Sequence, residues 1–253
     1  MSERTDVVTA LRQQQAELES LVDHLSEADW SRPSPCEGWD VADVVLHLAQ
    51  TDELAAGSLR GQFDAALARL TDGLPPSTSI DDGAAAMVAN ERDIGPSAIF
   101  ERHRASVAAL ADAIEHTDLS TRVQWVAGEL SARTLVSTRL AETWIHTGDV
   151  ADALGVALPP TDRLWHIARL AWRTLPYAFA RAGQQLSGPV ALILTGPSGE
   201  IWSFSDGTPA TTVTGDAFEL CRVAGRRLRP EDTSLTAAGP DGPDVLRLIR
   251  TYA

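Results

Sequence analysis

Apolar residues recur at helical spacing in the first part of the chain, as far as Leu154. Four long segments each carry one apolar stripe, and we predict a helix for each of them: residues 6–27, 41–59, 96–116 and 130–154. Turn-forming residues separate these segments, most clearly over residues 71–83. Gly155, which two prolines follow at short distance, predicts the end of the fourth helix. Four amphipathic helices joined by loops are typical of a four-helix bundle.

The pattern changes after Pro160, where apolar and β-branched residues alternate between helical stretches. A helix is predicted over residues 162–184, and strands are predicted over 189–195, 200–205 and 210–215. Two short helices are predicted over 216–227 and 243–253. The chain is therefore predicted to be mainly α. A helical bundle is expected over residues 1–158, followed by a small α+β domain over residues 159–253.

Composition and net charge limit the classes of partner that are expected for this protein. The formal net charge is −14, and a surface so acidic repels phosphate backbones and anionic lipids, so we expect neither nucleic acid nor a membrane as a partner. All 21 basic residues are arginine, which removes lysine from the candidate nucleophiles and bases. Two widely separated cysteines, Cys36 and Cys221, form no disulfide framework, and no signal peptide is visible, so a reducing cytoplasm is expected. A monomer and a homodimer are both open.

Glu142 and His146 lie four residues apart in the fourth predicted helix, within the stretch ETWIHTGDVADALG. Residues at this spacing share one helix face, so the carboxylate and the imidazole can converge on one point. Asp149 lies close to the same face, where it can accept a hydrogen bond from a metal-ligating histidine. The pair therefore predicts two ligands of a metal ion.

A third ligand is expected from a facing helix, and His47 is the best candidate. It lies at the edge of an apolar stripe, beside Val44 and Leu48, so its imidazole points inward. Two neutral imidazoles and one carboxylate are typical of a three-ligand catalytic zinc site with an open fourth position. The same donors also suit Fe(II), Ni(II) or Co(II).

These residues also have structural interpretations. The Glu-x-x-x-His spacing arises by chance on surface helices, and a single histidine beside an apolar stripe is commonly a hydrogen-bonded core residue. The other histidines are interpreted as solvated or structural, and Asp52, Glu53 and Glu129 as solvated helix charges. Cys36 is interpreted as a buried, inert thiol, the alternative being a loop thiol close to the metal-binding helix.

Two motifs of the chain resemble a known family. The segment DWSRPSPCEGWDVADVVLHLAQ, which contains His47, is similar to the N-terminal signature of the mycothiol-dependent maleylpyruvate isomerase family, within the broader DinB-like superfamily. The segment RLAETWIHTGDVADALG is similar to the family's second motif, a Glu-x-x-x-His followed by an Asp and a terminal Ala-Leu-Gly. The resemblance covers the whole chain. One departure is that Cys36 and Glu37 precede the Gly-Trp pair, where relatives often carry other residues.

The resemblance implies a DinB-like four-helix bundle followed by a small C-terminal domain related to sterol carrier proteins. It implies that His47, Glu142 and His146 hold zinc, and that an arginine of the C-terminal domain lies near the active site. Arg226, in the segment VAGRR, is the nearest match and is expected to be catalytic and to bind the cofactor. Arg222, one turn earlier, is expected to help bind the cofactor. Surface charge is the alternative interpretation of both arginines.

The predicted metal site and the resemblance together imply a metal-dependent enzyme that activates a low-molecular-weight thiol, which in this family is mycothiol. Metal coordination lowers the pKa of a thiol, and the thiolate then attacks an electrophilic carbon of a small substrate. The outcome would be S-transfer or cis–trans isomerisation, with Arg226 holding a carboxylate. One alternative is a thiol-independent hydrolase or lyase that activates water at the metal. Another is a non-catalytic metal-binding protein, whose site Asp149 or Glu53 closes as a fourth ligand.

Overall fold

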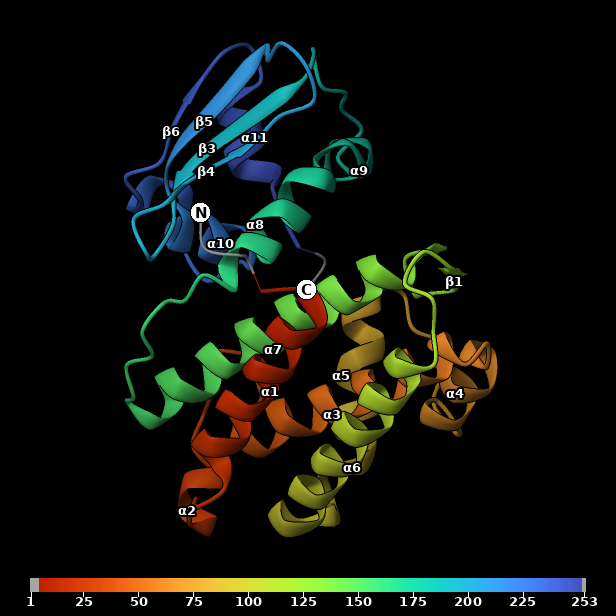
Figure 1. Cartoon of the computed structure of the whole chain (residues 1–253). Helices are drawn as coiled ribbons and strands as arrows, with labels where there is room; N and C mark the ends of the chain where they lie inside the picture. Colours follow the sequence, from red (N-terminus) through yellow and green to blue (C-terminus); the bar gives the residue numbers. More distant parts are fainter. Residues whose placement is uncertain (1–4, 252–253) are drawn as a thin grey trace. The chain divides into compact units, whose positions relative to one another are not determined.

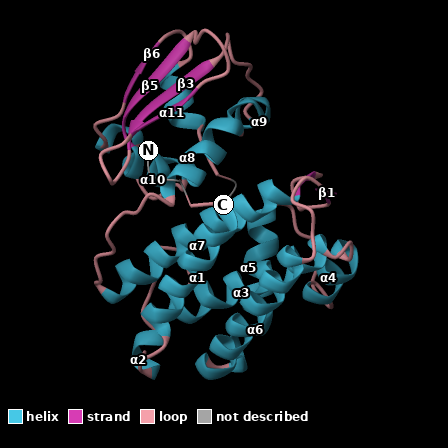
Figure 2. Ribbon diagram, in the orientation of Figure 1, coloured by secondary structure: helices cyan, strands magenta, loops and turns pink. Residues whose placement is uncertain are grey.

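The computed structural model describes residues 5–251, which divide into two compact units. One unit spans Val8–Leu158. The other is formed, within the described part of the chain, by residues 159–251 together with residues 5–7. Figure 1 colours the first unit from red to green and the second from teal to blue. The first unit is almost wholly helical, whereas the second combines helices with a sheet (Figure 2).

The first unit is built on four long helices. Its elements in chain order are α1 (Val7–Val22), α2 (Glu27–Trp30), α3 (Val41–Leu59), α4 (Phe63–Leu70), α5 (Ile80–Glu91), the 3₁₀ turn η1 (Arg92–Ile94), α6 (Pro96–Glu115), β1 (Arg122–Val123), β2 (Leu130–Ser131) and α7 (Ala132–Leu154). The long helices α1, α3, α6 and α7 form a bundle in which α3 packs against both α6 and α7. The predicted bundle is confirmed, although the first predicted helix ends earlier and Ser26 caps the separate helix α2.

The helix α3 is the central helix of the bundle. All of its residues except Ala42, Thr51 and Glu53 are buried. Its first turn is a capping box, because the side chains of Asp40 and Asp43 each accept a hydrogen bond from the other residue's backbone N–H. Since α3 is enclosed on nearly every side, its polar side chains need partners inside the protein.

Apolar residues from several helices form the core around α3. The buried members of this cluster are Leu18, Val22, Trp30, Val41, Val44, Val45, Leu46, Leu48, Val88, Ile99 and Val150. Burying one such side chain contributes about 1.5–3 kcal/mol to stability. The core therefore holds α3 firmly against α7, and with it the polar residues that these two helices carry.

The helix α7 carries two of the predicted metal ligands. It begins after Ser131, whose hydroxyl accepts a hydrogen bond from the backbone N–H of Thr134. It ends at Gly155, where φ is +71°, as predicted for the fourth helix. The left-handed backbone conformation costs roughly 1–2 kcal/mol for a residue with a side chain, which favours glycine at this position. None of the helices within residues 5–251 is both long and apolar enough to cross a membrane.

The second unit is an α+β fold, as predicted. Its elements are α8 (Leu164–Arg173), α9 (Leu175–Arg181), β3 (Val190–Thr195), β4 (Ile201–Phe204), β5 (Thr211–Asp216), α10 (Ala217–Ala224), the 3₁₀ turn η2 (Pro230–Asp232), β6 (Thr236–Ala238) and α11 (Gly242–Leu248). The four strands form one sheet in the order β4-β3-β5-β6. The central pair β3 and β5 is parallel, and the two outer pairs are antiparallel.

The predicted helix over 162–184 is in fact two helices. Pro176 lies in the first turn of α9 and has no N–H to donate to a carbonyl of the preceding turn. At the junction, the Thr174 hydroxyl donates to the carbonyl oxygens of Leu170 and Arg250. The short elements α4 and β6 were not predicted, because segments of this length show no clear periodicity.

Candidate metal centre

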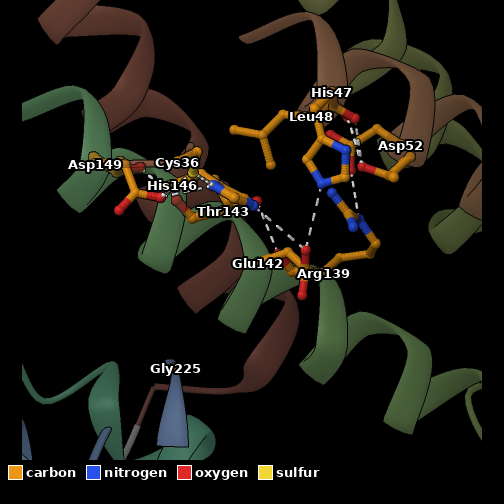
Figure 3. Close-up of polar contacts among 12 residues, drawn as sticks. Cys36, His47, Leu48, Asp52, Arg139, Glu142, Thr143, His146, Asp149 and Gly225 are labelled. Carbon is orange, nitrogen blue, oxygen red and sulfur yellow. Dashed lines mark hydrogen bonds and ion pairs between the residues drawn. The ribbon is translucent and has the colours of Figure 1, made fainter. Parts of the chain in front are cut away.

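Two helices bring the three predicted metal ligands together. His47 Nε2, on α3, lies 3.6 Å from Glu142 Oε2, on α7. His146 Nε2, one turn further along α7, lies 3.7 Å from the same oxygen. The centroids of the two imidazole rings are 5.0 Å apart, and the rings meet at 74°. Figure 3 shows the two imidazoles converging on the Glu142 carboxylate.

The donor atoms of this cluster fit a divalent cation. A tetrahedral ion with bonds of about 2.0–2.1 Å spaces its donors about 3.3 Å apart, a few tenths of an ångström less than the observed distances. His47, Glu142 and His146 are only 7%, 8% and 6% exposed. Among the described residues, Glu142 Oε1 is buried without a hydrogen-bond partner. An unpaired buried carboxylate oxygen costs about 1–3 kcal/mol or more, and a cation would satisfy it.

Burial and hydrogen bonding set the charge states of the three side chains. Burial lowers the pKa of His47, so this imidazole is held neutral, which is the form that binds metals. Burial by itself raises the pKa of Glu142, but the hydrogen bond with His47 and the charge of His146 outweigh it and lower the pKa below its usual value. The carboxylate is therefore ionised and supplies negative charge to the centre.

The far side of the His146 ring is bound to Asp149. Burial by itself lowers the pKa of His146, but hydrogen bonds with Asp149 and Cys36 outweigh it and raise the pKa to about 9. His146 Nδ1 lies 2.9 Å from Asp149 Oδ2, and Asp149 is 1% exposed. With Nδ1–H donated to Asp149, the Nε2 atom faces Glu142. A cation at Nε2 would thus replace a proton.

The loop between α2 and α3 also reaches this cluster. Cys36 is half-buried, and its Sγ lies 3.2 Å from Asp149 Oδ2. The structure therefore supports the alternative interpretation of Cys36, a loop thiol close to the metal-binding helix. The expectation that Cys36 is buried is wrong, whereas its inertness stays a prediction. Trp39 of the same loop packs its ring 5.1 Å from that of His47. Within the described residues, neither Cys36 nor Cys221 forms a disulfide.

A buried ion pair lies next to the centre, and sequence reasoning missed it. Arg139 Nε donates to Asp52 Oδ1 at 2.7 Å, and both side chains are 1% exposed. Figure 3 shows this pair beside His47 and Glu142. The prediction that Asp52 is a solvated helix charge is therefore wrong. A signal was available, because Arg139 precedes Glu142 by three residues and so shares its helix face.

Three other residues with predicted environments, two carboxylates and one histidine, differ in their exposure and contacts. Glu53 is not simply solvated, because it accepts hydrogen bonds from Arg102 and Arg69. Glu129 is exposed, as predicted, but it directly precedes β2 and does not lie in a helix. His103 is 1% exposed, and neither of its ring nitrogens has a hydrogen-bond partner among residues 5–251. It is therefore a core residue of α6, consistent with its structural interpretation.

Arg222 and Arg226 belong to the second unit. The Arg222 guanidinium lies on α10, with its carbon 5.7 Å from the centre of the Phe218 ring. Arg226 has a φ of +60°, the single positive value of a residue other than glycine among those described. Its Nη1 donates to the carbonyl oxygen of Arg247 at 3.1 Å. The expected role of both arginines toward a thiol or a substrate stays a prediction.

Comparison with known proteins identifies the family. The family described as the mycothiol maleylpyruvate isomerase N-terminal domain matches residues 11–151, which contain all three clustered donors. The chain belongs to this family. The match begins in α1 and ends near the end of α7, so it covers the helical bundle.

Two curated relatives match the whole chain. They are the uncharacterized proteins MT0041 of Mycobacterium tuberculosis strain CDC 1551 / Oshkosh and Rv0036c of M. tuberculosis strain ATCC 25618 / H37Rv. Each is 31% identical to this chain over 254 residues, covering 100% of this chain and 97% of the relative. The similarity therefore extends over both units.

Two solved structures share the fold. The crystal structure of the mycothiol-dependent maleylpyruvate isomerase matches with a TM-score of 0.63 at 22% identity. A histidine-to-alanine variant of that isomerase matches with a TM-score of 0.61 at 21% identity. Both matches cover 94% of this chain and 95% of the other. They support a helical domain followed by a small α+β domain.

Proposed function

We propose that this protein is a metal-dependent enzyme, with zinc as the metal. It activates mycothiol for S-transfer to a small electrophilic substrate or for cis–trans isomerisation of that substrate. The observation that carries the proposal is the convergence of the His47 and His146 imidazoles on Oε2 of the buried Glu142 carboxylate, whose other oxygen, Oε1, has no hydrogen-bond partner among the described residues. The family and the fold supply the thiol, because the proteins that define them are named for mycothiol-dependent isomerisation.

In this proposal His47, Glu142 and His146 hold the ion. Asp149 orients His146 by accepting a hydrogen bond from the Nδ1–H of that ring. A divalent metal at this point would supply a Lewis acid that lowers the pKa of a thiol. Glu142 contributes negative charge and geometry. Arg226, assisted by Arg222, would hold a carboxylate of the thiol or the substrate, which suits the planar guanidinium.

The position of neighbouring carboxylates favours an open coordination site over a closed, non-catalytic one. Asp149 binds the Nδ1 edge of the His146 ring, whereas the cluster forms at the Nε2 edge. Glu53 has both carboxylate oxygens occupied by Arg102, and one of them also binds Arg69. Neither carboxylate is arranged as a fourth ligand, so a position is left for a thiol.

Metal content tests the site, with one donor substituted on each of its two helices. Protein purified without chelators would be measured by inductively coupled plasma mass spectrometry as wild type, His47→Ala and Glu142→Ala. We expect about one ion per chain in the wild type and a loss in both variants. His116→Ala is the matched control, because this histidine lies on the same unit with its side chain 75% exposed. Metal retained in all of the variants would refute the site.

Thiol dependence tests the reaction. We expect mycothiol to change the absorption spectrum of the cobalt-substituted protein, and an S-methylated thiol to leave it unchanged. Maleylpyruvate, the substrate in the family's name, would then be supplied with and without mycothiol. Isomerisation that requires mycothiol supports an isomerase, and thiol binding without isomerisation directs the search to electrophiles to which the thiolate adds. Turnover that needs the metal and no thiol would refute the proposal in favour of a hydrolase or lyase.

A further inference from the structure

One thiol contacts the candidate metal centre from outside the three donors. Cys36 Sγ lies 3.2 Å from Asp149 Oδ2 and 3.8 Å from His146 Nδ1. The same oxygen, Asp149 Oδ2, lies 2.9 Å from His146 Nδ1. Two donors from different segments of the chain, one on the loop and one on α7, thus share a single carboxylate oxygen. Figure 3 shows Cys36 and Asp149 grouped on the same side of His146.

The loop itself determines where this thiol lies. The backbone N–H groups of Ser34 and Trp39 donate to the carbonyl oxygens of Trp39 and Cys36, at 2.9 Å and 3.0 Å. The backbone N–H of Cys36 donates to Ser34 Oγ at 3.1 Å, and Gly38 makes the turn with a φ of +76°. The ring of Trp39 packs against His47. The backbone of Cys36 is therefore held by contacts within the loop.

We propose that Cys36 is a positioning residue of the metal centre, whose S–H donates to Asp149 Oδ2 and so fixes the carboxylate that orients His146. The inference rests on the proposed metal site. The Asp149 carboxylate can rotate about its side-chain bonds, and the His146 ring that it holds would turn with it. A second donor from a rigid loop removes that freedom and keeps Nε2 directed at the metal position.

The size of the effect follows from the place of the thiol in this chain of contacts. Loss of a group that hydrogen-bonds a metal ligand typically lowers metal affinity about 10- to 100-fold. Cys36 acts one contact further away, and S–H is a weak donor. We therefore expect Cys36→Ala to weaken zinc or cobalt binding about three- to tenfold. Cys36→Ser keeps a donor in place and should stay within about twofold of the wild type.

The test compares wild type, Cys36→Ala, Cys36→Ser and Cys221→Ala by competition titration with zinc and by the cobalt(II) absorption spectrum. Cys221 is the matched control, because it is a fully buried thiol of the second unit. We expect an altered spectrum and weaker binding only in Cys36→Ala, with rescue in Cys36→Ser. Thermal unfolding of the metal-free proteins separates this from a general loss of structure, since Cys36→Ala and Cys36→Ser should unfold at similar temperatures.

Three results would overturn the inference. Equal affinities and spectra in Cys36→Ala and the wild type would show that the thiol does not position Asp149. A cadmium stoichiometry of two in the wild type and one in Cys36→Ala would make the thiol a ligand of a second ion rather than a positioning group. A wild-type protein that binds neither zinc nor cobalt would overturn the proposed function, and the inference with it.

Discussion

Removal of the Asp52 carboxylate should strongly destabilise the bundle. Asp52 and Arg139 form an ion pair with an Nε–Oδ1 distance of 2.7 Å, and both side chains are 1% exposed. Gln15 also donates to Asp52, at 3.3 Å. In Asp52→Ala the Arg139 guanidinium would stay buried without its counter-charge, and its Nη2 already lacks a hydrogen-bond partner among the described residues.

Breaking a buried ion pair on one side costs about 3–5 kcal/mol. At about 1.4 kcal/mol for each factor of ten, the unfolding constant should rise by roughly two to four powers of ten. The exposed pair of Asp112 and Arg60 provides the comparison, since its side chains are 58% and 41% exposed. Such surface pairs contribute about 0–1 kcal/mol, so Asp112→Ala should change little.

Hydrogen exchange of the α3 amides is the assay, because it measures the free energy of unfolding of the bundle even if the two units unfold separately. Both variants would be measured without metal, so that bound ions do not add stability. Equal protection of α3 in Asp52→Ala and Asp112→Ala would refute the reasoning. The double variant Asp52→Leu with Arg139→Met should recover most of the loss, because an apolar pair of similar volume removes the unpaired charge.

Three further predictions concern metal binding and stability. The pKa of His146 is about 9 in the metal-free protein, so a proton competes with a cation below that pH, and zinc affinity in a competing-chelator titration should rise with pH and level off above about pH 9. A pH-independent affinity would contradict this competition. Gly155→Ala should lower the free energy of unfolding in urea by about 1–2 kcal/mol, because Gly155 adopts a φ of +71°. Leu48→Ala should cost about 2–5 kcal/mol in the same measurement, because Leu48 is fully buried in the core around α3, and an unchanged midpoint would contradict that placement.

Much of the local structure was predictable from the sequence. The spacing of apolar residues predicted the four long helices, and Gly155 marked the end of α7. The pairing of Glu142 with His146 was also local, because the geometry of any helix places residues four apart on one face. The relative positions of residues within one helix do not depend on the rest of the chain.

The buried charges were not predictable in the same way. Asp52 was assigned to solvent because an apolar stripe marks the buried face and leaves charged positions outside it. In the structure α3 is enclosed on nearly every side, so no face of it is free for an ionised side chain. For such a helix, a position outside the apolar stripe cannot be assigned to solvent from the sequence pattern.

The sequence by itself determined the long helices, the type of the second unit and the shared face of Glu142 and His146. Only the tertiary structure decided that His47 Nε2 lies 3.6 Å from Glu142, that Cys36 reaches Asp149, and that Asp52 pairs with Arg139. The physical reason is that burial and ion pairing depend on segments far apart in the chain. Asp52 and Arg139 are separated by 87 residues, and no pattern within either helix specifies the other.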